Sequence, residues 1–75
     1  VYPNPAIEFI NFKFDSREKR GTIEIWSSIG NLIKQVKFNG DLVQIDTDEL
    51  NNGSYIYRVC IEDDVIIGHF TVLKN

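Results

Sequence analysis

Hydrophobic and polar residues alternate with a period of two along most of the chain. The clearest segments are residues 10–14, 22–26 and 55–61, in which hydrophobic residues recur at every second position. Successive side chains of a β-strand point to opposite faces, so this period predicts strands that are buried on one face. No stretch repeats hydrophobic residues at intervals of three and four for long enough to predict a helix.

Six segments of this kind predict six strands, and their β-branched and aromatic residues suit a pleated, half-buried surface. The phase of the alternation breaks between Phe9 and Ile10, inside the first segment. Pro3 and Pro5 lack the N–H that a ladder hydrogen bond needs, so residues 1–2 are expected to form a short seventh strand at a sheet edge. The six main segments are residues 7–14, 22–26, 32–38, 42–45, 55–61 and 65–73.

Short polar segments with glycine or asparagine separate the predicted strands. Asn39-Gly40 is the strongest hairpin signal, because both residues accept the positive φ of a tight turn. Residues 29–31, 51–53 and 62–64 are expected to form the other turns. The regular spacing predicts an all-β fold, a small Ig-like antiparallel β-sandwich of about seven strands with three or four strands in each sheet.

The alternation also selects a hydrophobic core. Each large apolar side chain that becomes fully buried contributes roughly 1.5–3 kcal/mol before the entropy cost of ordering is subtracted. Trp26 is out of phase with Ile23 and Ile25, so it is expected on the outer face, either covering an open sheet or stacking on a sugar or a partner. The predicted core consists of Ile10, Phe12, Ile23, Ile25, Leu32, Val36, Val43, Ile45, Leu50, Tyr55, Tyr57, Val59, Phe70 and Val72.

The composition is that of one globular domain. Hydrophobic residues make up 43% and charged residues 25% of the 75 residues, which differs from the composition of a disordered chain. The net charge is −3, and the one basic cluster, at residues 17–20, is interrupted by Glu18. A phosphate backbone requires concentrated Lys and Arg, so no nucleic-acid partner is expected. No apolar run approaches the ~20 residues that span a bilayer, so no membrane insertion is expected.

The sequence offers no catalytic or metal-binding constellation. Cys60 is the single cysteine and has no neighbouring histidine to act as a base, which favours an inert buried thiol. His69 alone provides one ligand, whereas zinc takes roughly three or four. The acidic clusters at residues 46–49 and 62–64 lack the ligand spacing of an EF-hand, so solvated turns are expected. No cofactor is expected, and so small a domain has little room for a substrate cleft, so an enzyme is not expected.

Four blocks of the sequence match one known family in order and spacing. Residues 1–6 read Val-Tyr-Pro-Asn-Pro-Ala, and residues 23–33 form a strand segment that stops at Gly30 and restarts on apolar residues. In residues 50–59 an apolar residue is followed by a polar stretch, a glycine and a tyrosine, and residues 68–74 form a last strand that ends on a basic residue. Together these blocks resemble the C-terminal sorting domains of type IX secretion in Bacteroidota.

The resemblance implies a non-catalytic sorting module. It spans essentially the whole chain and departs from the family pattern at residues 27–28, at Ser54 and at His69, none of which belongs to the predicted core. Such domains lie at the C-terminus of a cargo protein that passes through the periplasm, where an outer-membrane translocon recognises the folded domain. A sortase-like peptidase then removes it, and the cargo is released outside the cell or attached to the cell surface.

Residues 1–75 are therefore expected to form a single domain excised from a larger cargo protein, because the sequence begins at Val1 inside the opening motif. The final strand is expected to dock on the translocon, with Lys74 supplying charge, since a free sheet edge offers unpaired N–H and C=O groups. The resemblance implies that several motif positions are recognised by the translocon. Each of them also has a structural explanation: a rigid corner, a special backbone angle or packing in the core. These positions are Pro3, Asn4, Pro5, Gly30, Gly53, Tyr55, Gly68, His69 and Lys74.

Two other functions fit the same pattern of strands. One is a fibronectin-like or Ig-like structural spacer of a secreted enzyme, which sequence continuing beyond Asn75 would favour. The other is a carbohydrate-binding accessory module that uses Trp26, Tyr2 or Phe38, because exposed aromatic rings stack on sugars. Tryptophan fluorescence that shifts when polysaccharide is added would favour this module.

Overall fold

The computed structural model describes residues 9–14 and 20–73, which form six β-strands and no helix. All six main strands that the alternation predicts are confirmed. The short strand predicted at residues 1–2 lies outside the described residues. The strands are β1 (Phe9–Lys13), β2 (Arg20–Ser27), β3 (Leu32–Asn39), β4 (Leu42–Asp46), β5 (Gly53–Ile61) and β6 (Asp64–Val72).

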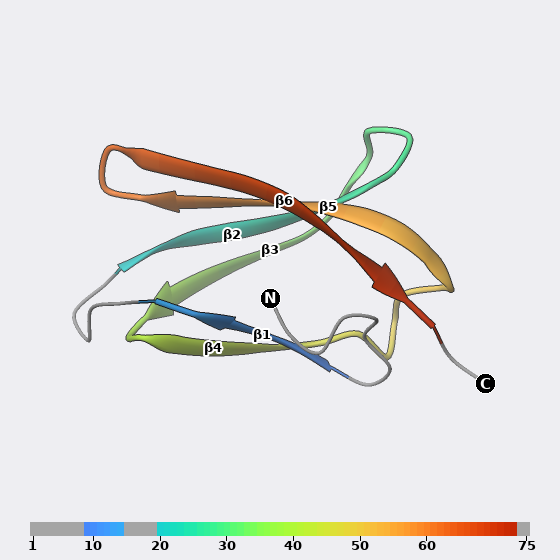
Figure 1. Cartoon of the computed structure of the whole chain (residues 1–75), viewed down its shortest axis with the longest axis horizontal. Coiled ribbons are helices and arrows are strands. Elements are labelled where there is room, and N and C mark those ends of the chain that lie inside the picture. Colours follow the sequence, from blue (N-terminus) through green and yellow to red (C-terminus); the bar gives the residue numbers. More distant parts are fainter. Residues whose placement is uncertain (1–8, 15–19, 74–75) are drawn as a thin grey trace.

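The strands form two antiparallel sheets that pack as a sandwich. One sheet has four strands in the order β3-β2-β5-β6, and the other pairs β1 with β4. Figure 1 shows the two sheets as separate layers, with the four-stranded sheet above the two-stranded one. The predicted all-β sandwich is confirmed, although the described strands divide as four and two rather than into sheets of three or four. We call the side of the four-stranded sheet that points away from β1 and β4 the outer face.

The turn at Asn39-Gly40 connects the two sheets, so the hairpin predicted there is wrong. Because β3 pairs with β2 whereas β4 pairs with β1, the chain changes layers between Asn39 and Leu42. Gly40 has a φ of 132°, and the Asp41 carbonyl accepts a hydrogen bond of 2.7 Å from the N–H of Phe14. The local sequence dictates the sharp turn, but burial of the apolar face of β4 against the larger sheet decides which strand β4 pairs with.

Two other predicted turns do form hairpins within the four-stranded sheet. The β2–β3 turn is closed by hydrogen bonds from the N–H of Ser27 to the Asn31 carbonyl and from the N–H of Gly30 to the Ser27 carbonyl, 2.8 and 3.0 Å long. Its Ser27 hydroxyl also accepts a 3.1 Å hydrogen bond from the Asn31 N–H. In the β5–β6 hairpin, Glu62 adopts a φ of 52°, which costs a non-glycine residue conformational energy.

The hydrophobic core lies between the two sheets. Its aromatic rings interlock: Phe14 stacks on Phe38 at a centroid distance of 4.9 Å, and Tyr55 stacks on Phe70 at 5.6 Å. Phe38 and Ile61 are buried although the predicted core omits them, and three predicted members, Val36, Val43 and Tyr57, are partly buried against it. The buried core consists of Ile10, Phe12, Ile23, Ile25, Phe38, Ile45, Leu50, Tyr55, Val59, Ile61, Phe70 and Val72.

Leu32 is 48% exposed, so its predicted place in the core is wrong. The cause is a register shift next to Ile25, which pairs with Lys34, whereas the following residue, Trp26, pairs with Leu32. The extra residue on β3, Ile33, reverses the phase of the alternation. Leu32 therefore joins Trp26 on the outer face.

Candidate recognition surface

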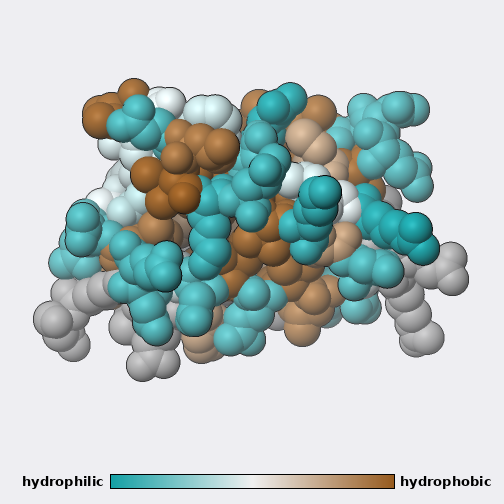
Figure 2. Space-filling model, turned by 180° about the vertical axis from the view of Figure 1, so that it is seen from behind, coloured by the Kyte–Doolittle hydropathy of each residue, from teal (hydrophilic) through white to brown (hydrophobic). Residues whose placement is uncertain are grey.

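The outer face carries apolar and basic side chains from three neighbouring strands. Trp26 of β2 lies opposite Ile56 of β5, and Ile56 in turn lies opposite His69 of β6. In the adjacent row Arg58 of β5 lies opposite Ile67 of β6. Trp26 is half-buried on the face opposite to the core, where its phase predicts it. Figure 2 shows hydrophobic side chains reaching the surface in the upper part of the molecule, where the four-stranded sheet lies.

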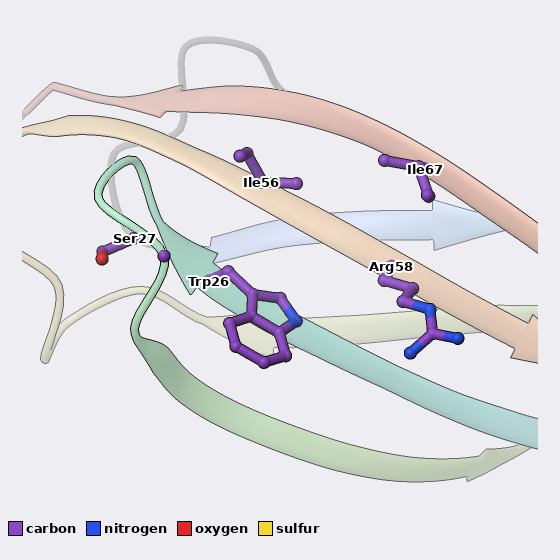
Figure 3. A pocket seen from close by; sticks show the side chains of 6 residues that line it. Trp26, Ser27, Ile56, Arg58 and Ile67 are labelled. Atoms are coloured by element: carbon purple, nitrogen blue, oxygen red, sulfur yellow. The ribbon is translucent and has the colours of Figure 1, made fainter.

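A shallow hollow of about 250 Å³, here named the outer hollow, lies on this face. Figure 3 shows the indole of Trp26 and the side chain of Arg58 projecting on the same side of the sheet. Arg58 Nη1 lies 3.4 Å from Glu24 Oε1, and the arginine side chain is 48% exposed, so this ion pair contributes little to stability. The hollow is lined by Trp26, Ser27, Gly30, Ile56, Arg58 and Ile67.

A second hollow of about 110 Å³, here named the inner hollow, lies on the opposite side of the same sheet. It is formed by the C-terminal end of β1 with the residue that follows, by β5 and by β6. The Phe12 and Tyr57 rings meet edge to face beside it, with their centroids 5.0 Å apart. The hollow is lined by Phe12, Lys13, Phe14, Tyr57, Val59 and Ile66.

Strand β6 forms one edge of the four-stranded sheet (Figure 1) and pairs only with β5 among the described strands. Its consecutive residues Val65, Ile66 and Ile67 are 51%, 48% and 68% exposed. Apart from Asp64 at its start and His69, the strand has no ionisable side chain. A long apolar edge of this kind is a ready template for another strand.

The other edge of the same sheet, β3, is protected in the usual ways. It carries Lys34 and Lys37, and the register shift at Ile33 interrupts its pairing. Charged side chains and bulges are the devices that keep an edge strand from pairing with other chains. The two edges therefore differ in kind, because β6, unlike β3, presents three consecutive apolar residues, Val65 to Ile67, and no lysine or arginine.

Two of the predicted motif glycines occupy positions where the backbone requires glycine. Gly30 has a φ of 93° in the β2–β3 turn, and Gly53 has a φ of 153° at the start of β5. Both are exposed, and no atom lies close to the position that a Cβ would occupy. Backbone geometry is therefore sufficient to explain both residues.

Tyr55 is buried, and its hydroxyl donates a 2.7 Å hydrogen bond to the Asn51 carbonyl four residues earlier. This bond ties down the segment in which the chain crosses from β4 in one sheet to β5 in the other. A tyrosine that bonds back to the upstream backbone in this way is a known device of Greek-key sandwiches, the tyrosine corner. The glycine and tyrosine of the third motif block thus form one structural unit with Asn51.

Gly68 and His69 lie next to each other on β6 but have different environments. Gly68 lies opposite Tyr57, and an added Cβ would overlap the ring and hydroxyl of that tyrosine. His69 is exposed on the outer face beside the outer hollow. The structure thus brings Gly53, Tyr55, Gly68 and His69 together on the adjacent strands β5 and β6. The predicted site residues Pro3, Asn4, Pro5 and Lys74 lie outside the described residues.

The described residues contain no group of three His, Cys, Asp or Glu side chains placed to hold a metal ion. Nor does the described part contain a helix long and apolar enough to cross a membrane. Phe38 is only 9% exposed and stacks on Phe14, which removes it from the aromatic residues that a carbohydrate-binding surface could use.

Comparison with protein families agrees with the motif blocks. The family model described as the secretion system C-terminal sorting domain matches residues 1–72. The chain belongs to this family. The sorting domain is thus a type IX secretion C-terminal sorting signal, as the resemblance of its motif blocks predicts. No curated protein and no solved structure matches it.

Family membership places this sorting domain among the tails of cargo proteins that the type IX system exports to the cell surface or the extracellular space. The family consists of targeting signals rather than enzymes. Arg58, Ile66 and Ile67, which line the two hollows of the sorting domain, are absent from the sites that its sequence predicts. The sequence signal that could have identified this surface is the run of three β-branched residues at positions 65–67. A strand that is apolar on both faces needs cover on both faces.

Proposed function

We propose that this domain is the export address of a larger cargo protein and that it catalyses no reaction itself. In this proposal the cargo precedes the domain in the parent chain, passes through the periplasm and is handed to the outer-membrane translocon of type IX secretion. A sortase-like peptidase then removes the domain, and the cargo is released or attached to the cell surface. The match of residues 1–72 to the sorting-domain family is the observation that carries this proposal.

The translocon reads the domain at its last strand and at the chain end that follows. The exposed apolar edge of β6 supports this part of the proposal. His69 projects from that strand into solvent, and Lys74 supplies a positive charge beyond it. Pro3, Asn4 and Pro5 are proposed as further contacts. The geometry of Gly30, Gly53, Tyr55 and Gly68 supports a role in shaping the strands that present this edge.

The experiment fuses the domain to a periplasmic reporter in a host with type IX secretion and measures reporter at the cell surface. Deleting residues 73–75 removes the chain end while keeping Val72, which is fully buried and belongs to the core. We expect the fusion to be exported and the truncated fusion to stay in the periplasm with the domain folded. Failure of the intact fusion to leave the periplasm would contradict the sorting function, and wild-type export of the truncated fusion would contradict recognition of the chain end.

A charge substitution isolates the contribution of Lys74 to recognition. Lys74→Gln is expected to lower surface reporter, whereas Lys37→Gln, the same change at an exposed position on β3, leaves it unchanged. The unfolding temperature of both variants is measured to check that the fold is retained. Equal loss of export in the two variants would show that Lys74 has no special role.

A further inference from the structure

We propose that the β6 edge binds an extended strand of a partner protein in which two adjacent apolar residues are flanked by carboxylates. The inference rests on the sorting function proposed above and names the chemistry of the partner segment. In this interaction, the backbone of the added strand pairs with the edge, while its side chains enter the outer and inner hollows. Binding of this type takes its affinity from main-chain hydrogen bonds and its specificity from pockets for alternate side chains.

The two hollows meet the edge at consecutive residues. Ile67 lines the outer hollow and Ile66 lines the inner hollow, so the hollows lie on opposite sides of the same strand. Successive side chains of an added strand also point to opposite sides of the sheet. One side chain of the added strand therefore lies beside Ile67 and the next one beside Ile66. Two adjacent apolar residues in the partner therefore cover both isoleucines.

Each hollow also has one basic side chain in its lining. Arg58 lies on the outer side, directly opposite Ile67, with its side chain 48% exposed. Lys13 lies on the inner side and is exposed. On the outer side, Glu24 lies 3.4 Å from Arg58. Carboxylates on both sides of the apolar pair of the partner therefore complement the charges that border its binding site.

A second copy of this chain matches these features less well. Its own β6 offers adjacent apolar residues, but Asp64 is the one carboxylate of that strand and lies at its first position. It can therefore supply a charge at one end of the apolar pair only. The β3 edge, with Lys34 and Lys37 and an interrupted register, does not offer the continuous uncharged template that strand addition requires.

The test uses the 75-residue chain and a synthetic peptide of about six residues, the usual length of a strand, with two central valines and an aspartate on each side. Binding is measured by titration with amide chemical shifts as the readout, and self-association is measured by sedimentation. Two control peptides carry lysine in place of aspartate, or proline in place of one valine. We expect the shifts to concentrate on β6 and its neighbour β5, and both control peptides to bind more weakly.

Three substitutions distinguish the edges of the sheet. Ile66→Lys and Ile67→Lys are expected to weaken peptide binding about tenfold or more, because each removes apolar contact area and opposes strand pairing. Ile33→Lys makes the same change on the β3 edge, where the isoleucine is 47% exposed against 48% for Ile66, and is expected to leave binding unchanged. Thermal unfolding of all three variants checks that the fold is retained.

The possible outcomes separate this inference from the sorting function. Equal binding of the aspartate and lysine peptides, or an equal loss in the Ile33→Lys and Ile67→Lys variants, would overturn the inference while export of the reporter fusion still supports sorting. Self-association that is abolished by Ile67→Lys, with no peptide binding, would overturn it in favour of a second copy as the occupant. If the peptide binds to β6 but the Ile66→Lys and Ile67→Lys variants export the reporter as well as the wild type does, the β6 edge is not the contact used in export, and the inference is overturned. Failure of the intact reporter fusion would contradict sorting regardless of peptide binding.

Discussion

At the scale of single residues, the motif positions of this domain divide by what surrounds them. Tyr55 is buried with its hydroxyl bonded to the Asn51 carbonyl, and Gly53 has a φ that glycine adopts without strain. His69, which directly precedes the buried Phe70 on β6, faces solvent. A sequence motif can thus combine residues that build the recognised shape with residues that a partner could touch.

The Tyr55 hydroxyl is expected to stabilise the crossing between the sheets. Tyr55→Phe removes the 2.7 Å hydrogen bond and leaves the Asn51 carbonyl without that partner, which costs about 1–2 kcal/mol of unfolding free energy. Tyr57→Phe is the matched control, because its hydroxyl makes no hydrogen bond with another described residue. Urea unfolding measures both variants. Equal stabilities of the two variants would mean that the hydrogen bond contributes nothing net.

The β5–β6 hairpin contains a position where the natural residue is strained. Glu62 has a φ of 52°, which costs a residue with a Cβ about 1–2 kcal/mol, whereas glycine adopts it freely. Glu62→Gly is therefore expected to raise the unfolding temperature. Asp63→Gly, at the next position, where φ is not positive, is expected to lower it, because glycine adds entropy to the unfolded chain. Lower stability of Glu62→Gly than of the parent would contradict the strain argument.

At the scale of elements, β6 has two roles, since one of its sides completes the core and its free edge lies at the surface. Phe70 and Val72 are fully buried in the core, whereas residues 65–67 are exposed at the edge. Its pairing with β5 is continuous from Asp64 to Val72, without a bulge. The strand is thus held in place by the core while its edge is presented to the surroundings.

The Tyr57 ring is expected to be the reason why position 68 of β6 requires glycine. Gly68→Ala places a Cβ against the Tyr57 ring and is expected to cost about 1–3 kcal/mol by overpacking. In a Tyr57→Ala background the same change is expected to cost nothing or to stabilise slightly, because alanine suits a strand better than glycine. Unfolding free energies of the two single variants and the double variant give the coupling. Additive effects would show that the ring does not oppose the added Cβ.

At the scale of the whole molecule, the domain combines a small core with a surface that is not fully protected. Folded domains are stable by roughly 0.05–0.15 kcal/mol per residue, which gives about 4–11 kcal/mol for 75 residues. Twelve of the described hydrophobic residues are buried in the core, and loss of a large one removes a substantial part of this stability. If the translocon reads the folded domain, as proposed, export depends on these buried core residues as well as on the surface.

Export is expected to follow folding when the core is weakened. Phe70→Ala costs about 3–5 kcal/mol, because Phe70 is fully buried and stacks on Tyr55. This variant is expected to unfold at much lower urea concentration and to lose export of the fused reporter. Ile29→Ala, at a turn residue that is 83% exposed, is expected to keep both. Undiminished export by an unfolded Phe70→Ala domain would mean that the signal is read as an unfolded segment.

The sequence by itself determined the all-β class, the six main strands, most of the core and the family, because alternation, turn residues and motif blocks are local signals. Tertiary structure decided the partner of each strand. Asn39-Gly40 has the residues of a hairpin but connects two layers, and Leu32 leaves the core because a bulge reverses its phase. Tertiary structure also decided that β3 is a protected edge of the four-stranded sheet and that β6 is an open one. A local pattern states which face of a strand is apolar, whereas what covers that face depends on segments far away in the chain.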